Sequence, residues 1–128
     1  MSSAVLDASA LLALLQAEPG SDTVAEAVAA GAAIGTVNLS EAVAKLVEAG
    51  VPDATIPEVV DALVLEVVDF DTELAYRAGR LRRATQAAGL SFGDRACLAL
   101  AQRLGLPALT ADRRWSRLAL DVAIRQIR

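Results

Sequence analysis

The sequence contains no histidine and only one cysteine, Cys97. The absence of histidine excludes His-based acid–base catalysis and Ser-His-Asp or Cys-His nucleophilic machinery. A single cysteine cannot form an intrachain disulfide, and without histidine it cannot complete a conventional zinc site. Any chemistry must therefore come from carboxylates, hydroxyls, arginines or a bound ion.

Aromatic side chains and long apolar runs are also scarce. Aromatic residues make up 3% of the chain, so leucine, valine and alanine have to fill the core. No uncharged apolar run approaches the roughly 18 residues that a membrane span needs, and no basic residue precedes the first apolar segment, as it would in a signal peptide. We expect a cytoplasmic protein without membrane contact, folded as a single domain over residues 1–128.

Charge is divided unevenly along the chain, although the net charge is only −4. Before Leu65 the only cation is Lys45, against nine acids. From Leu65 onward there are eleven arginines against seven acids. Because arginine is the better phosphate ligand, the second half of the chain is suited to a polyanion despite the negative total.

Short apolar runs alternate with helical patterns along the whole chain. The sequence predicts strands at about residues 4–6, 33–37, 65–69, 107–110 and 122–124. Between them it predicts helices that begin near residues 8, 22, 38, 57, 71, 91 and 112, and the helix from residue 71 continues to Gly89. Strands that alternate with helices indicate an α/β fold whose parallel sheet carries helices on both faces.

Four acids stand where a predicted strand gives way to a helix or where a helix begins: Asp7, Glu41, Asp94 and Asp112. Ligands of open α/β sheets bind beyond the carboxyl ends of the strands, so we expect all four side chains at that one edge. Each acid alone also fits a capping role. Asp7 and Asp112 suit N-cap positions, and Asn38-x-x-Glu41 and Ser91-x-x-Asp94 resemble capping boxes.

The four acids together favour a metal site over simple capping. Two carboxylates about 4 Å apart repel by roughly 4 kcal/mol at an effective dielectric constant of 20, whereas an acid at a helix N-terminus gains only about 0.3–1 kcal/mol. A cluster of four therefore needs a cation. Oxygen ligands without histidine or cysteine select Mg²⁺ or Mn²⁺, and such an ion can promote phosphodiester hydrolysis.

The same four segments resemble the acidic motifs of PIN-domain ribonucleases in order and spacing. They are Val5-Leu6-Asp7-Ala8-Ser9-Ala10, Asn38-Leu39-Ser40-Glu41, Ser91-Phe92-Gly93-Asp94-Arg95-Ala96 and Leu109-Thr110-Ala111-Asp112-Arg113. The resemblance covers essentially the whole chain and is closest to VapC-type toxins of toxin–antitoxin pairs. It implies a PIN-like three-layer α/β/α sandwich around a mostly parallel sheet of four to five strands. It also implies a Mg²⁺- or Mn²⁺-dependent endoribonuclease that forms a homodimer and is inhibited by a VapB-like antitoxin.

The resemblance assigns roles to particular residues. Asp7, Glu41, Asp94 and Asp112 correspond to the family's metal-site acids, and we expect Asp7 and Asp94 to be the principal ligands. Ser9 and Thr110 match accessory hydroxyl positions that hydrogen-bond the carboxylates or a water molecule, although both also suit ordinary turns. Asn38 stands where the family often has serine or threonine.

Three arginines next to the predicted site, Arg95, Arg113 and Arg114, are candidates for holding RNA phosphates. Phe92 and Trp115 could stack on RNA bases, but burial in the core is the better expectation for both.

Other functions fit the pattern less well. A haloacid-dehalogenase-like phosphatase expects Asp-x-Asp after the first strand, where this chain has Ser9 as the third residue. A receiver-like signalling domain expects paired acids there and a lysine late in the chain, but the only lysine is Lys45. A PIN fold that serves only as an interaction module would not need all four acids.

Overall fold

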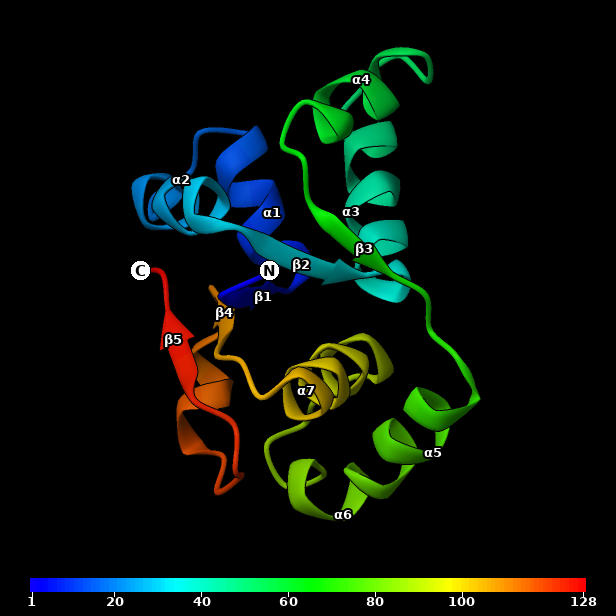
Figure 1. Cartoon of the computed structure of the whole chain (residues 1–128), viewed down its shortest axis with the longest axis vertical. Coiled ribbons are helices and arrows are strands. Elements are labelled where there is room, and N and C mark those ends of the chain that lie inside the picture. The colour runs from blue at the N-terminus through cyan, green and yellow to red at the C-terminus, as the bar shows by residue number, and fades with distance from the viewer.

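The computed structural model describes residues 1–128 as a five-stranded, wholly parallel sheet between layers of helices (Figure 1). The strands are β1 (Ala4–Leu6), β2 (Ala32–Gly35), β3 (Glu66–Val68), β4 (Ala108–Thr110) and β5 (Ile124–Gln126). The helices are α1 (Ala8–Leu15), α2 (Ser21–Ala30), α3 (Thr36–Glu48), α4 (Thr55–Asp61), α5 (Thr72–Arg80), α6 (Arg82–Thr85) and α7 (Phe92–Leu104), with a 3₁₀ helix η1 (Arg113–Arg117). The predicted α/β/α fold and strand number are confirmed.

Successive side chains of β1 point to opposite faces of the sheet and so belong to two separate apolar cores. Val5 packs on one face of the sheet with residues of α5 and α7, and buried Trp115 lies in the same core. Ala4 and Leu6 point to the opposite face, where they pack against α1 and α2. Figure 1 shows these layers, with α1 and α2 above the sheet and α5 to α7 below it.

The strand order β3-β2-β1-β4-β5 places a topological switch at β1. From β1 the chain moves outward through β2 to β3, and it then crosses back to add β4 and β5 on the other side. Connections from β1 and β4 therefore leave in different directions and open a crevice at the carboxyl end of β1. Asp7 is the first residue after that strand.

Helix α3 begins earlier than predicted. Thr36 and Val37 belong to the helix and not to the strand before it, and extended Gly35 is the N-cap. The Thr36 hydroxyl, in the first turn of the helix, accepts a hydrogen bond from the backbone N–H of Phe70 at 3.0 Å. Asn38 is therefore inside the first turn of the helix, and the predicted capping box from Asn38 to Glu41 is wrong.

The single helix predicted from residue 71 to Gly89 is interrupted at Leu81 to give α5 and the short α6. Thr85 is fully buried, and its hydroxyl donates to the Leu81 carbonyl at 2.8 Å. This kind of back-bonding bends helices. Smaller differences are shifts of about two residues in α4 and β5.

Helix α7 lies against the middle of the sheet and is the most deeply buried helix. Seven of its residues are buried, and Gly105, at a left-handed φ of 66°, ends it. No helix in the structure combines the length and the apolar character needed to cross a bilayer.

Candidate active site

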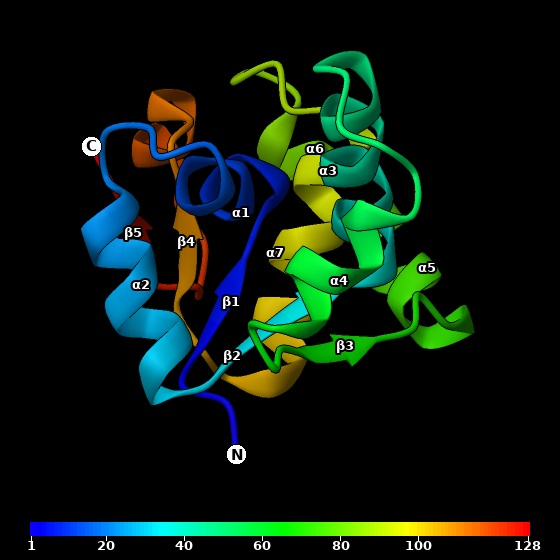
Figure 2. The ribbon, with the colours of Figure 1, turned by 90° about the horizontal axis from the view of Figure 1, so that it is seen from above.

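The four predicted acids line one cavity of about 220 Å³ at the carboxyl edge of the sheet. Asp7 follows β1, Glu41 lies on α3, Asp94 is in the first turn of α7, and Asp112 follows β4. In Figure 2 the N-terminus is at the bottom, and β1 runs upward to this edge, where α1 begins. Residues more than 100 positions apart in the sequence thus share one cavity.

Asp7 is 5% exposed, and both of its carboxylate oxygens accept hydrogen bonds. The Ser9 hydroxyl and the Ala10 backbone N–H donate to Oδ1 at 2.7 and 2.8 Å, and the Thr110 hydroxyl donates to Oδ2 at 2.6 Å. Burial raises the pKa of Asp7 above its ordinary value, although these hydrogen bonds oppose the shift. Asp7 is at once the N-cap of α1 and a rigidly oriented buried acid.

Glu41 is held against the N-terminus of α7 by Asn38 and Gly93. The Asn38 amide donates to Glu41 Oε1 at 2.9 Å and to the Gly93 carbonyl at 3.0 Å. A Cβ atom at Gly93 would overlap the Glu41 carboxylate, so only glycine leaves room for it. Partial burial raises the pKa of Glu41, the Asn38 hydrogen bond opposes the shift, and the charges of Asp94 and Asp7 add to it.

Asp94 forms the predicted capping box with Ser91, which is confirmed. The Ser91 backbone N–H donates to Asp94 Oδ2 at 2.8 Å, and the Asp94 N–H donates to the Ser91 hydroxyl at 3.2 Å. The negative charge of Asp94 also raises the pKa of both Asp7 and Glu41. Capping therefore coexists with an electrostatic cluster of three acids.

Asp112 differs from the other three acids because it is paired with a cation. It caps η1 by accepting from the Arg114 backbone N–H, and the Arg114 guanidinium forms an ion pair with it at 2.7 Å. This guanidinium lowers the pKa of Asp112 below its ordinary value. The sequence placed Arg114 near the site but did not indicate this pairing.

The other two arginines proposed as RNA contacts lie in different settings. Arg95 donates to the Ala78 carbonyl at 3.1 Å, which joins α7 to α5, and its guanidinium lies 6.0 Å from the centre of the Phe92 ring. Arg113 is exposed at the start of η1.

The two aromatic residues near the site have opposite environments. Trp115 is fully buried, as expected, and so cannot stack on a base. Phe92 is 50% exposed, so the expectation that it belongs to the core is wrong. Its ring packs edge-on against Phe70 with the centroids 5.5 Å apart, which leaves the rest of the ring at the surface beside the site.

Sequence reasoning missed Lys45, which lines the same cavity as the acids. Lys45 is one helical turn beyond Glu41 on α3, and residues four apart share a helix face. The four-residue spacing between Glu41 and Lys45 could therefore have placed Lys45 near the acids from the sequence alone. The Lys45 ammonium also forms an exposed ion pair with Glu48 at 3.6 Å.

The donor atoms of the cavity fit a hard divalent cation. They are carboxylate oxygens supported by hydroxyl and amide groups, without histidine or an exposed thiol, which is the ligand chemistry of Mg²⁺ and Mn²⁺. As they stand, no three acidic side chains of the chain are close enough to form a ready-made metal cluster. An ion held here would need these carboxylates to move closer together. The Glu41 carboxylate already lies against Gly93 in the first turn of α7.

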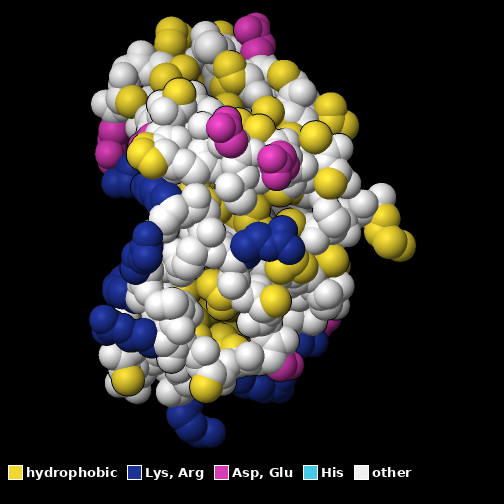
Figure 3. Space-filling view, turned by 90° about the vertical axis from the view of Figure 1, so that its left-hand side faces the viewer, with side chains coloured by type: hydrophobic (Ala, Val, Ile, Leu, Met, Phe, Trp, Pro, Cys, Tyr) yellow, Lys and Arg dark blue, Asp and Glu magenta, His cyan; other side chains and the backbone are white.

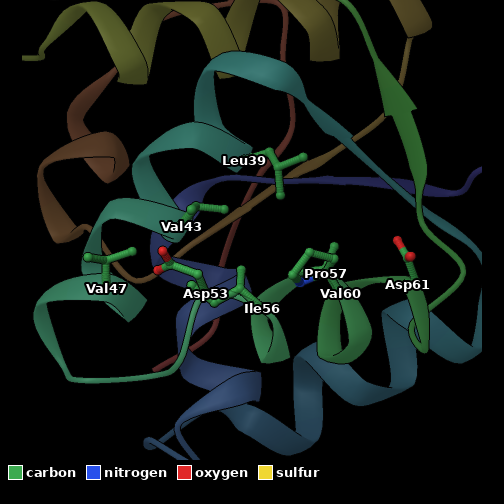
Figure 4. A pocket seen from close by; sticks show the side chains of 8 residues that line it. All are labelled: Leu39, Val43, Val47, Asp53, Ile56, Pro57, Val60 and Asp61. Atoms are coloured by element: carbon green, nitrogen blue, oxygen red, sulfur yellow. The ribbon is translucent and has the colours of Figure 1, made fainter.

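A second cavity, of about 330 Å³, lies between α3 and α4 and is mainly apolar. Figure 4 shows the side chains of α3 facing those of α4 across it, with an acid towards each end. The lining residues are Leu39, Val43, Val47, Asp53, Ile56, Pro57, Val60 and Asp61. We refer to this feature as the α3–α4 groove.

The uneven charge of the sequence persists on the surface. In Figure 3 the Lys and Arg side chains lie along one edge, near the middle and at the lower end of the face that is shown, while most of its acidic side chains lie in the upper half.

A family model of the PIN domain matches residues 4–120. The chain belongs to the PIN domain family. PIN domains are generally nucleases, and the four acids of this PIN domain occupy its cavity at the carboxyl edge of the sheet.

Solved structures with the same fold come from toxin–antitoxin complexes. The PIN domain is similar to a chain of DNA-bound VapBC from Salmonella typhimurium, with 20% identity, a TM-score of 0.79 and both chains fully covered. It is also similar to a chain of a toxin–antitoxin complex from Klebsiella pneumoniae, with 20% identity, a TM-score of 0.76 and 98% of each chain covered. For VapBC-5 from Mycobacterium tuberculosis the identity is 25% and the TM-score 0.65, with 98% of this chain and 99% of that chain covered. The predicted membership of the PIN domain family is confirmed, and the solved structures to which the chain is similar include VapBC complexes. No curated protein matches the sequence.

Proposed function

We propose that this PIN domain is a Mg²⁺- or Mn²⁺-dependent endoribonuclease that acts in the cytoplasm as the toxin of a VapBC-type pair. The observation that carries the proposal is the convergence of Asp7, Glu41, Asp94 and Asp112 on one cavity. Burial and mutual repulsion disfavour ionisation of Asp7 and Glu41, and a cation would relieve both costs. The phosphatase and receiver alternatives lose their support because the fold and the family are those of PIN domains.

Asp7, Glu41 and Asp94 would hold the ion. When bound, the ion lowers the pKa of water and neutralises charge that develops on the phosphoryl group. Ser9 and Thr110 fix the Asp7 carboxylate, and Asn38 fixes Glu41 Oε1 while leaving Oε2 without a hydrogen-bond partner. Glu41 Oε2 is thus free to bind the ion.

RNA contact is proposed for Arg113 and for the exposed part of Phe92. Arg113 offers an exposed guanidinium for phosphate, and Phe92 offers an aromatic face for an unpaired base. Arg95 would act mainly by holding Phe92 and α5 in place, since its Nη1 already donates to the Ala78 carbonyl.

Cleavage assays with purified protein test the enzymatic proposal. Structured RNA should be cut in the presence of Mg²⁺ or Mn²⁺, and cutting should stop with EDTA. Asp94→Asn and Glu41→Gln should each lower the rate at least about 100-fold, the scale of loss expected for a group that acts on transition-state charge. Asp22→Asn, which removes an exposed acid from the first turn of α2, is the matched control and should cut normally.

Cell growth tests the toxin proposal separately. Expression of the wild-type protein alone should arrest bacterial growth, whereas the Asp94→Asn protein should not. Co-expression of a VapB-like antitoxin from a neighbouring reading frame should restore growth. Normal growth with fully active wild-type protein would remove the toxin role but leave the nuclease proposal standing.

A further inference from the structure

Arg114 is fixed on Asp112 by more contacts than any other ion pair in the protein. Its Nε lies 3.1 and 3.2 Å from the two Asp112 oxygens, and its Nη2 lies 2.7 Å from Oδ2. Its backbone N–H also donates to Oδ1 at 2.9 Å. The planar guanidinium therefore meets the carboxylate through two nitrogens, which is the strong and orientation-specific form of this interaction.

The far side of the same guanidinium reaches the start of α7. Nη1 donates to the Gly89 carbonyl at 2.9 Å, and Nη2 lies 3.6 Å from Asp94 Oδ2. Arg114 thus joins η1 to the turn before α7 across the rim of the acidic cavity. These contacts hold its charge in one place although the side chain is half exposed.

The four acids differ in how many carboxylate lone pairs their hydrogen bonds leave free to bind a cation. A carboxylate has about four lone-pair sites. At Asp112 the Arg114 backbone N–H donates to Oδ1, Nη2 donates to Oδ2, and the one Nε–H is shared between both oxygens. Three of the four sites are therefore taken, and the adjacent guanidinium already neutralises the charge of this carboxylate. Asp7 keeps one free site on Oδ2, Asp94 keeps Oδ1, and Glu41 keeps Oε2.

We propose that Arg114 is a resident counter-ion that withdraws Asp112 from ion binding. The inference rests on the metal-dependent function proposed above. The site then takes one divalent cation through Asp7, Glu41 and Asp94, while the Asp112 carboxylate stays with Arg114 and is not available to bind that ion or a second one. Arg114 is accordingly a positioning residue that sets the number and affinity of bound ions through Asp112.

Calorimetric titration with Mn²⁺ measures the number of bound ions and their affinity directly, and it requires no RNA cleavage. The wild-type protein should bind one ion, and Arg114→Ala should bind at least about tenfold more tightly or take up a second ion, since about 1.4 kcal/mol corresponds to a factor of ten. Arg117→Ala is the matched control, because it removes the same charge from the same 3₁₀ helix and Arg117 forms no ion pair. It should bind as the wild type does.

A double-mutant cycle shows whether the effect passes through Asp112. In an Asp112→Asn background, Arg114→Ala should no longer raise the affinity. Buried Trp115, next to Arg114, reports by fluorescence whether η1 stays packed, and Arg114→Gln serves if the alanine variant fails to fold. Arg114→Lys keeps the charge but loses the two-nitrogen contact, so its affinity should lie between those of the wild type and Arg114→Ala.

The possible results distinguish a failure of the proposed role of Arg114 from a failure of the metal-dependent function on which it rests. Equal Mn²⁺ affinities for Arg114→Ala and Arg117→Ala would overturn the inference, even if the wild-type protein binds one ion and cuts RNA. An equal gain in the Asp112→Asn background would overturn it as well. If no variant binds Mn²⁺, the metal-dependent function fails and the inference falls with it.

Discussion

Asp7 combines deep burial with a negative charge that its hydrogen bonds only partly compensate. Its pKa in the folded protein is raised, mainly by burial, above the ordinary value of 3.8. Protonation therefore favours the folded state. The stability gained from protonated Asp7 is fully present below the pKa of Asp7 in the unfolded chain, and it is lost as pH rises through the pKa in the folded protein. At neutral pH without a metal ion, the ionised side chain should destabilise the fold.

Asp7→Asn should consequently raise the unfolding temperature at pH 7 in EDTA by a few degrees. This gain in unfolding temperature should vanish as the pH falls below 3.8, the ordinary pKa of an aspartate side chain. The asparagine oxygen can still accept from Ser9 and Ala10, and the Thr110 hydroxyl can turn to accept from the new amide. Circular dichroism melts from pH 3.5 to 8 measure the effect, with Asp22→Asn as the control. A lower melting temperature for Asp7→Asn at pH 7 would show that the buried charge is already compensated without an ion.

Adding one carbon atom at Gly93 should affect stability and ion binding in opposite ways. A Cβ there would overlap the Glu41 carboxylate, which is the flexible end of a long side chain and can move away. Gly93→Ala should keep or slightly raise stability, because alanine is better than glycine inside a helix by about 1 kcal/mol. It should nevertheless weaken Mn²⁺ binding and slow RNA cleavage by displacing Glu41.

Gly79→Ala is the matched control for that experiment. Gly79 lies in α5 with no atom within 4 Å of an added Cβ, so the substitution gains helix propensity and touches nothing. Both alanine variants should melt at or above the wild-type temperature, but only Gly93→Ala should lose ion affinity. Unchanged Mn²⁺ affinity in Gly93→Ala would remove Glu41 from the proposed ligand set.

At the scale of elements, α7 owes its start to the capping box as well as to its apolar contacts. Ser91→Ala removes the acceptor for the Asp94 N–H and should lower stability by about 1 kcal/mol, or roughly 4 °C in a domain of this size. Ser91→Gly should cost only a few tenths of a kcal/mol. Thermal melts compare the two variants. The Ser91 backbone still holds Asp94, so Mn²⁺ binding should survive in both.

At the scale of the molecule, the α3–α4 groove is the candidate surface for the proposed antitoxin. Its apolar walls and the acids Asp53 and Asp61 suit a partner helix that carries apolar and basic side chains. Val43→Asp places a charge on the α3 wall and should weaken capture of the antitoxin about tenfold or more. RNA cleavage by the isolated protein should not change, because Val43 does not line the acidic cavity.

Val67→Asp is the control for the groove, since Val67 is a partly exposed apolar residue of β3 outside it. Pull-down with tagged antitoxin, followed by titration, measures both variants. Wild-type affinity in the Val43→Asp protein would place the antitoxin on a different face.

The sequence alone determined the features that depend on local spacing. Alternating apolar runs fixed the α/β class, and strand-to-helix junctions identified Asp7, Glu41, Asp94 and Asp112 as residues of one edge. Ser91 and Asp94 are three residues apart, so their capping box was readable as well. These signals involve near neighbours or the general geometry of parallel sheets, and neither requires knowledge of particular long-range contacts.

Only the tertiary structure decided how the residues around those acids are used. Thr36 lies in α3 with its hydroxyl bonded to the backbone of Phe70, and Phe92 is half exposed because its ring packs only edge-on against Phe70. Arg114 became the partner of Asp112 because the turn at Gly89 fixes the other end of its guanidinium. Each outcome depends on residues 22 to 34 positions apart, whose approach is set by packing of the whole chain and not by local sequence.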